Sequence, residues 1–169
     1  MKNIKCPSCQ QIRQTHKGEY HYTESGLPNV WLRGVEIFEC DCSEKFAFIP
    51  CIEELHKLIG KKLIGKEDQL SSSEIRFLRK HLMLKSKDFA KELGVQNVTV
   101  SRWENGDSQP SESVDRLIRL VYAIKIGLSK ADKALVMNNF QKLKKGHHET
   151  KLYSFPARLF IKRSCVVNA

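Results

Sequence analysis

The sequence predicts an α+β protein of two domains, a small β-rich N-terminal domain followed by an all-α domain. Three observations support this fold class. The chain has 169 residues, enough for one ordinary domain or two small ones. Residues 1–50 contain short aromatic and β-branched runs, turn residues and two close cysteine pairs. From residue 71 onward, apolar side chains recur at helical spacing between candidate helix caps.

Short strands are expected in the first fifty residues. The runs YHYT, NVWL and VEIFEC are rich in the aromatic and β-branched side chains that strands favour. Turn residues cluster between them in KGEY, ESGLPN and LRGVE. A domain this small rarely buries enough apolar surface to fold alone, so it usually needs a disulfide or a metal ion.

Four cysteines are the candidates for holding such a metal ion. Cys6-Pro-Ser-Cys9 forms a tight two-cysteine turn, and Cys40-Asp-Cys42 follows after the strand-rich stretch. Four thiolates can bind one tetrahedral Zn²⁺, with each sulfur at about 2.3 Å, and they leave no open position for catalysis. We therefore predict a structural zinc ion held by Cys6, Cys9, Cys40 and Cys42.

One feature of the second pair leaves its ligands open. Because only one residue separates Cys40 from Cys42, Cys51, His16 or His21 could take the place of one of them as a zinc ligand.

No apolar leader directs export, so we expect a cytoplasmic, reducing compartment, where cysteines are thiols or metal ligands rather than disulfides. No run approaches the roughly 18 apolar residues of a transmembrane helix, so no membrane partner is expected.

Residues 71–128 show the clearest helical pattern. Candidate caps begin four successive helices, and these caps are Ser71 to Ser73, Ser86, Asn97 and Pro110-Ser111. Gly94 and Asn105-Gly106 are expected to end the second and third helices. A further helix is predicted in SKADKALVMNNFQKLKK, where Ser129 and Asp132 resemble a capping box.

The second and third of these helices, joined at LGVQN, fit a helix-turn-helix. Such a motif inserts the first residues of its second helix into the major groove of DNA. Val100 and Trp103 are expected to face the domain core. The opposite face is expected to carry Asn97, Val98, Ser101 and Arg102.

The side chains of the outward face match the edges of base pairs. Arginine reads guanine in a bidentate contact, asparagine suits adenine, and a valine methyl meets the methyl group of thymine. Other polar residues are placed to contact phosphates, and these are Ser86, Gln96, Thr99 and Asn105. Glu104 is expected to pair with Arg79 of the first helix and so to fix that helix to the end of the third.

The charge is unevenly distributed along the chain. There are 29 Lys and Arg against 19 Asp and Glu, a formal net charge of +10. Residues 129–169 contain nine of the basic side chains and two of the acidic ones. Such an excess favours an anionic partner, usually nucleic acid.

The domain limits follow from these patterns. Ile52, Leu55, Leu58 and Ile59 fall on one helical face, and the run GKKLIGKEDQ, with two glycines, is interpreted as a linker. Four segments result: a zinc-binding domain at 1–64, a linker at 65–70, a helix-turn-helix domain at 71–128 and a basic C-terminal extension at 129–169.

Two long stretches resemble a known family. The run EIRFLRKHLMLKSKDFAKELGVQNVTVSRWENGDSQPS resembles the Cro/repressor (XRE-type) helix-turn-helix. CPSC, GLPNVWLRGVEIFECDC and FIPC are similar to the N-terminal zinc domain of MqsA-family antitoxins. The resemblance covers roughly residues 4–125 with both halves in order. The chain departs from the family in its Cys-x-Cys pair, usually Cys-x-x-Cys there, and in its basic extension.

The resemblance implies a homodimeric repressor that binds a palindromic operator in double-stranded DNA, often its own promoter. It also implies that the zinc domain binds a cognate toxin, typically a small ribonuclease, in a type II toxin-antitoxin system. The matching positions place base contacts at Asn97, Val98 and Arg102 and a structural pair at Arg79 and Glu104. The resemblance also assigns zinc binding to the four matching cysteines, Cys6, Cys9, Cys40 and Cys42.

Two other functions compete with this one. The first is a stand-alone zinc-containing regulator of a phage or mobile element, without a toxin partner. The second is an enzyme, either a zinc-dependent hydrolase or a nuclease. The sequence has no HExxH motif, no paired carboxylates and no nucleophile elbow. We therefore expect a protein that is not an enzyme.

Overall fold

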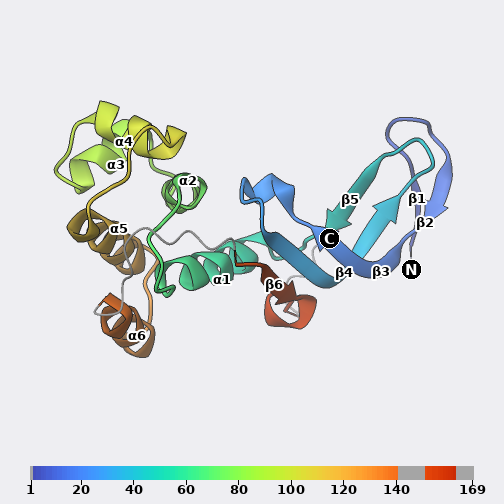
Figure 1. Cartoon of the computed structure of the whole chain (residues 1–169). Helices are drawn as coiled ribbons and strands as arrows, with labels where there is room; N and C mark the ends of the chain where they lie inside the picture. The colour runs from blue at the N-terminus through green and yellow to red at the C-terminus, as the bar shows by residue number, and fades with distance from the viewer. Residues whose placement is uncertain (1, 141–150, 163–169) are drawn as a thin grey trace. The chain divides into compact units, whose positions relative to one another are not determined.

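The computed structural model of the chain describes residues 2–140 and 151–162, and it divides into two compact units (Figure 1). The first unit contains the described residues up to Leu55 together with residues 151–162. The second unit begins at His56. The predicted fold class is confirmed, because a β-rich part with a cysteine cluster precedes a helical part. The domain limits predicted from the sequence differ from this division and stay a prediction.

The first unit is built from a hairpin and a four-stranded sheet. Strands β1 (Asn3–Lys5) and β2 (Ile12–Gln14) pair antiparallel. In the sheet, β4 (Val30–Glu39) pairs antiparallel with β3 (His16–His21) along one edge. Its other edge carries β5 (Lys45–Phe48), antiparallel, and β6 (Tyr153–Pro156), parallel. Short 3₁₀ helices η1 (Thr23–Ser25) and η2 (Ala157–Leu159) complete the unit.

Strand β4 corrects the turn that the run LRGVE predicted. VWL and VEIFE are two halves of one continuous strand. The register of the pairing passes from Gly18 opposite Val35 to Glu19 opposite Arg33, so Gly34 has no partner in β3. Gly34 has a φ of 71°, the left-handed conformation that glycine adopts in a β-bulge. The glycine therefore bends the strand and does not end it.

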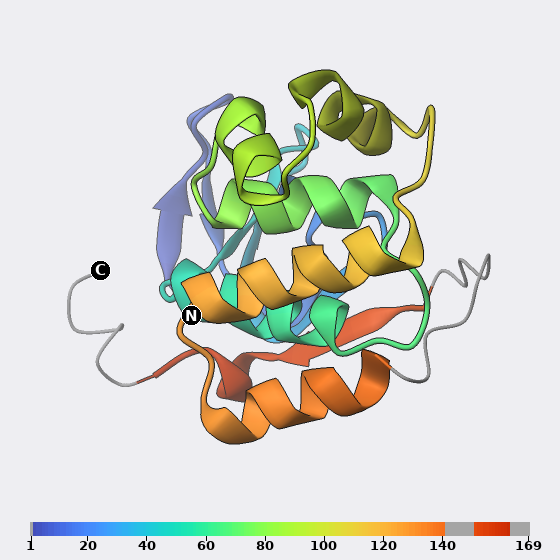
Figure 2. The same cartoon turned by 90° about the vertical axis from the view of Figure 1, so that its left-hand side faces the viewer.

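In its described residues the second unit contains six helices, of which α1 begins within the first unit. Their bounds are α1 (Ile52–Ile64), α2 (Ser72–His81), α3 (Ser86–Glu92), α4 (Asn97–Asn105), α5 (Glu112–Lys125) and α6 (Lys130–Phe140). Helix α5 packs against α2 and α6, while α3 and α4 pack on each other (Figure 2). In the described residues, no helix is long and apolar enough to cross a bilayer. The rest of the predicted extension, 141–150 and 163–169, lies outside the described residues.

Three of the six helices begin with a serine cap. Ser71 and Glu74 form a capping box on α2, Ser111 caps α5, and the hydroxyl of Ser129 accepts a hydrogen bond from the Asp132 amide. The predicted caps Ser86 and Asn97 are wrong. Each is the first helical residue, and the caps are Lys85 and Gln96, whose side chains make no capping hydrogen bond.

Helix α1 covers the first half of the run GKKLIGKEDQ, and the predicted linker at 65–70 follows directly after the helix. The helix continues through Gly60 to Ile64, with Leu55, Ile59 and Leu63 fully buried. Gly60 lies against the ring of Tyr122 in α5, and a Cβ atom at this position would be 1.7 Å from the tyrosine oxygen. The glycine is therefore required by a close approach of two helices.

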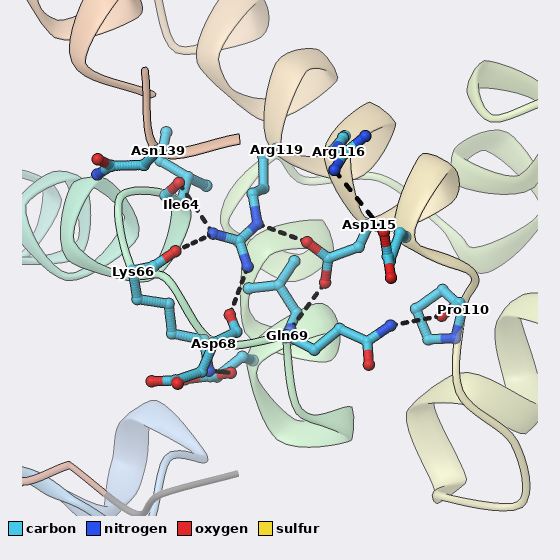
Figure 3. Close-up of polar contacts among 12 residues, drawn as sticks. Ile64, Lys66, Asp68, Gln69, Pro110, Asp115, Arg116, Arg119 and Asn139 are labelled. Carbon is cyan, nitrogen blue, oxygen red and sulfur yellow. Dashed lines mark hydrogen bonds and ion pairs between the residues drawn. The ribbon is translucent and has the colours of Figure 1, made fainter. Parts of the chain in front are cut away.

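The chain segment after α1 is held by a buried ion pair (Figure 3). Arg119 and Asp115 of α5 are both fully buried, with Nε 2.6 Å from Oδ1. Arg119 also donates hydrogen bonds to the carbonyl oxygens of Ile64, Lys66 and Asp68, at 3.2, 2.5 and 2.7 Å. The second Asp115 oxygen accepts a hydrogen bond from the amide of Leu70, at 2.7 Å. The side chains of Arg119 and Asp115 thus hold residues 64–70 against α5 through hydrogen bonds to the backbone of this segment.

Candidate DNA interface and metal centre

Helices α3 and α4 are joined by a tight turn at Leu93 to Gln96. Gly94 has a φ of 66°, and its amide donates to the Lys91 carbonyl at 3.2 Å. The Val95 amide donates to the Ala90 carbonyl at 3.0 Å, which completes a Schellman motif. The predicted end of α3 at Gly94 is confirmed. Gly106, with a φ of 85°, ends α4 in the left-handed conformation as well.

The inner face of α4 is apolar. Val100 is fully buried and Trp103 is 5% exposed, so the predicted burial of both side chains is confirmed. Leu93 of the turn and Phe89 of α3 are also buried. Because α3 and α4 share this core, the outer face of α4 is presented by a rigid pair of helices.

The outer face of α4 carries the residues predicted to contact DNA. Gln96, Asn97, Ser101, Arg102 and Asn105 are exposed, Val98 is 54% exposed, and Thr99 is half-buried. Arg102 forms no salt bridge with any other described residue. The exposed guanidinium group of Arg102 is therefore free to meet a ligand.

Two predicted contact residues are placed differently from the others. Ser86 is half-buried at the start of α3, and its hydroxyl oxygen is buried without a partner among the described residues. The side-chain oxygen of Asn105 accepts a hydrogen bond from Arg76, at 3.0 Å. No local pattern in the sequence points to Arg76, whose role depends on the position of α2 beside the end of α4.

Glu104 joins α2 to the end of α4. Arg79 makes a bidentate contact with its carboxylate, with Nε–Oε1 at 2.6 Å and Nη2–Oε2 at 2.8 Å. Only 14% of the Arg79 side chain and 8% of the Glu104 side chain are exposed. The hydrogen bonds to Glu104 raise the pKa of Arg79 above its usual value. Arg79 also donates to the Leu84 carbonyl at 2.8 Å, so one guanidinium holds α2, the α2–α3 turn and α4 together.

The four predicted zinc ligands lie together in the first unit. The Sγ atoms of Cys6, Cys9, Cys40 and Cys42 are all within 4.8 Å of one another. Cys6 and Cys42 are 3.6 Å apart, and Cys9 and Cys40 are 3.4 Å apart. Tetrahedral thiolates at the usual zinc–sulfur distance would be separated by about 3.8 Å. The donor set and its spacing therefore fit one divalent metal ion of the zinc type.

The two cysteine turns have matching backbones despite their different spacing. Gln10 and Ser43, each directly after its cysteine pair, have φ angles of 64° and 72°. The Gln10 amide donates to the Cys6 carbonyl at 3.1 Å, and the Ser43 amide donates to the Cys40 carbonyl at 3.0 Å. A hydrogen bond from the Cys42 amide lowers the pKa of the Cys40 thiol to about 7. The shorter Cys-x-Cys loop thus still directs both sulfurs to one point.

The alternative ligands lie outside this cluster. Cys51 is buried and is not part of the cluster. The His21 ring stacks on Trp31 with centroids 4.7 Å apart, and its Nε2 lies 2.8 Å from the Pro28 carbonyl. His16 lies beside a hollow next to Thr15 and is also outside the cluster.

The structure thus has two candidate sites, a thiolate cluster able to bind a metal ion and a helix pair with an exposed polar edge. The helix pair belongs to the class of motifs that DNA-binding regulators use. Residues 75–120 match the family model described as Helix-turn-helix, so this part of the chain is a helix-turn-helix domain. Comparisons with curated proteins and with solved structures gave no match.

Proposed function

We propose that this protein is a sequence-specific, dimeric transcriptional repressor that binds a palindromic DNA operator through α4 and acts as an antitoxin. The observation that carries the proposal is the exposed edge of α4, with Asn97, Val98 and Arg102 on a rigid helix-turn-helix. These three side chain types recognise base edges in the major groove. Repression follows when the occupied operator overlaps a promoter.

The helix ends add support for contacts with phosphates. In α2, α5 and α6 a serine hydroxyl accepts a hydrogen bond from an amide of the first turn, whereas α3 and α4 begin without such a cap. The first N–H groups of an uncapped helix remain available, and together with the helix dipole they attract phosphate oxygens. DNA phosphates would accept hydrogen bonds from these N–H groups at the N-termini of α3 and α4.

In this proposal the metal site is structural, and the ion is Zn²⁺. Four sulfurs complete a tetrahedral shell, so no position is left for water or a substrate. The site ties β1, the β1–β2 turn and the β4–β5 turn together in a unit with little core around these turns. Metal-bound thiolates can replace the missing apolar contacts.

The antitoxin role rests on the resemblance of residues 4–125 to MqsA-family proteins. By that resemblance, the first unit binds a cognate toxin, a small ribonuclease, and the protein represses its own operon. A stand-alone regulator is the outcome if no toxin exists. The proposed function includes no catalytic step by this protein.

In vitro selection tests the DNA-binding part of this proposal. The full-length, zinc-loaded protein is incubated with random duplexes, and bound duplexes are amplified through several rounds. We expect an enriched palindrome whose half-sites are separated by about one helical turn, the spacing that a dimeric helix-turn-helix requires. Recovery of duplexes without a shared sequence would contradict specific binding.

Co-expression tests the antitoxin part separately. The neighbouring open reading frame is expressed with and without this protein. We expect growth arrest and RNA cleavage without it, rescue with it, and a complex that co-purifies. A neighbouring product that neither arrests growth nor binds would contradict the antitoxin role and leave DNA binding intact.

A further inference from the structure

A hollow in the first unit is used by neither the thiolate cluster nor the helix-turn-helix. Its volume is about 620 Å³. Pockets for small organic ligands span roughly 300–1,000 Å³. The residues that matter for its chemistry are Lys2, Lys17, Glu36, Phe48, Arg158 and Ile161.

The walls of this hollow differ in chemistry. Phe48 and Ile161, with Ile49 and Ala157 beside them, provide an apolar surface. Lys2, Lys17 and Arg158 provide positive charge, against the single carboxylate of Glu36. An apolar surface beside a few charged groups is the usual composition of a site for a small molecule.

The three cations, Lys2, Lys17 and Arg158, form no ion pair within the part of the chain that the structure describes. Glu36 already accepts a hydrogen bond from the hydroxyl of Thr15, at 2.6 Å. With three cations against one carboxylate, the hollow carries a net positive charge, so an anion bound between the cations is stabilised.

The fold assembles this hollow from segments far apart in the sequence. Lys17 of β3 lies opposite Glu36 of β4 in the sheet register. Gly34, at the bulge in β4, contributes no side chain, and the space where its Cβ would be is open. Residues 157–161, which follow β6, bring Arg158 and Ile161 to the same hollow. Such convergence of separate segments is typical of a built site rather than a chance groove in one loop.

We propose that this hollow binds a small organic anion, a compact apolar body that carries a carboxylate or a phosphate group. The anionic group lies among Lys2, Lys17 and Arg158, and the apolar body packs on Phe48 and Ile161. The site does not involve α4 or the thiolates, so the proposal stands independently of the proposed DNA binding.

A fluorescent anion provides the first test. Full-length, zinc-loaded protein is titrated with anilinonaphthalene sulfonate, whose emission rises in an apolar site, and benzoate and phenyl phosphate are then added as competitors. We expect saturable binding of one probe per chain. Lys17→Glu and Arg158→Glu should each weaken it by at least about tenfold, since hydrogen bonds to charged groups are the strong ones. Displacement by benzoate or by phenyl phosphate identifies the preferred anionic group.

Two controls keep the result specific. Lys80→Glu, at an exposed position of α2, makes the same charge reversal far along the sequence and should leave the probe affinity unchanged. Ala157→Leu fills the hollow without a change in charge and should also weaken binding. Circular dichroism and the zinc content show that each variant is folded.

The location of the bound probe decides the matter. In heteronuclear NMR spectra, benzoate and the probe should shift the amide signals of Lys17, Glu36, Phe48 and residues 157–161. Equal affinities of the wild type, Lys17→Glu and Arg158→Glu would overturn the proposal. Shifts confined to other residues, or binding of duplex DNA at these positions instead of the small anions, would overturn it as well.

Discussion

At the scale of the residue, Glu104 holds the helix-turn-helix in shape. Replacing it with alanine leaves Arg79, only 14% exposed, without its bidentate partner. An ion pair that is partly buried costs more to break than a surface pair, so we expect Glu104→Ala to lower the free energy of unfolding by about 1–3 kcal/mol. Chemical denaturation followed by circular dichroism measures this change.

A surface pair in the same unit is the control for that variant. The Nζ atom of Lys125 lies 2.8 Å from Oε1 of Glu92, and about a third or more of each side chain is exposed. Glu92→Ala should change the free energy of unfolding by less than about 0.5 kcal/mol. Equal effects of the two variants would show that Glu104 does not fasten α4 to α2.

At the scale of the element, Gly60 sets how closely α1 and α5 approach. Alanine normally stabilises a helix interior by roughly 0.5–1 kcal/mol relative to glycine. Here the added Cβ would collide with the Tyr122 ring and displace its hydroxyl from His81 Nδ1, now 2.6 Å away. We therefore expect Gly60→Ala to destabilise the protein by about 1–3 kcal/mol, measured by chemical denaturation. Stabilisation would contradict the close contact.

The buried pair of α5 makes a second prediction at this scale. Arg119→Met leaves the Asp115 carboxylate buried without its counter-charge and frees three backbone carbonyl oxygens. We expect a loss of about 3–5 kcal/mol in the free energy of unfolding. Hydrogen exchange at the Leu70 amide, which donates to Asp115, should also accelerate.

The double variant separates charge from packing in that network. Asp115→Leu combined with Arg119→Met removes both buried charges at once. It should recover part of the stability lost in Arg119→Met, because no unpaired charge remains. If the double variant is less stable than Arg119→Met, the hydrogen bond from Leu70 to Asp115 outweighs the ion pair.

At the scale of the whole molecule, the two units should respond differently to loss of the metal. Chelation is expected to unfold the first unit, because its four thiolates would repel one another or take up protons. The helical unit, with its own apolar core, should stay folded. Metal analysis should find one zinc ion per chain, and calorimetry should show a transition that disappears with the metal.

A matched pair of variants checks the metal prediction. Cys9→Ser removes one of the four clustered sulfurs and should abolish zinc binding. Ser8→Ala, in the same turn, removes only a hydroxyl that donates to Glu44 at 2.8 Å and should retain zinc. Full zinc content in Cys9→Ser would exclude the four-sulfur site.

Local patterns in the sequence predict much of this molecule and fail where distant segments meet. Helical spacing and the glycines at 94 and 106 predict α3, α4 and the burial of Trp103. The same local view treats Gly34 and Gly60 as turn and linker residues. Their actual roles depend on β3 and on Tyr122, which no local pattern identifies.

The same limit applies to the sites. Cysteine spacing predicts the four sulfurs that cluster, because a metal site leaves its donors visible in the sequence. The hollow that contains Lys17 and Arg158 has no such signal, since β6 and the residues after it give no clear pattern and pair with a strand far earlier in the chain. The contact of Arg76 with the end of α4 also joins two segments apart in the sequence, so no local pattern predicts it.

The most direct test of base recognition by α4 is the affinity of Arg102→Ala for two duplexes, measured by fluorescence anisotropy at fixed salt. One duplex carries the sequence selected by the wild type, and the other carries the same bases scrambled. The account predicts a loss of about 1–3 kcal/mol on the selected duplex and little change on the scrambled one, while Lys80→Ala leaves the preference intact. An equal loss on both duplexes would show that Arg102 contacts only phosphates, and no loss on either would contradict the role of α4.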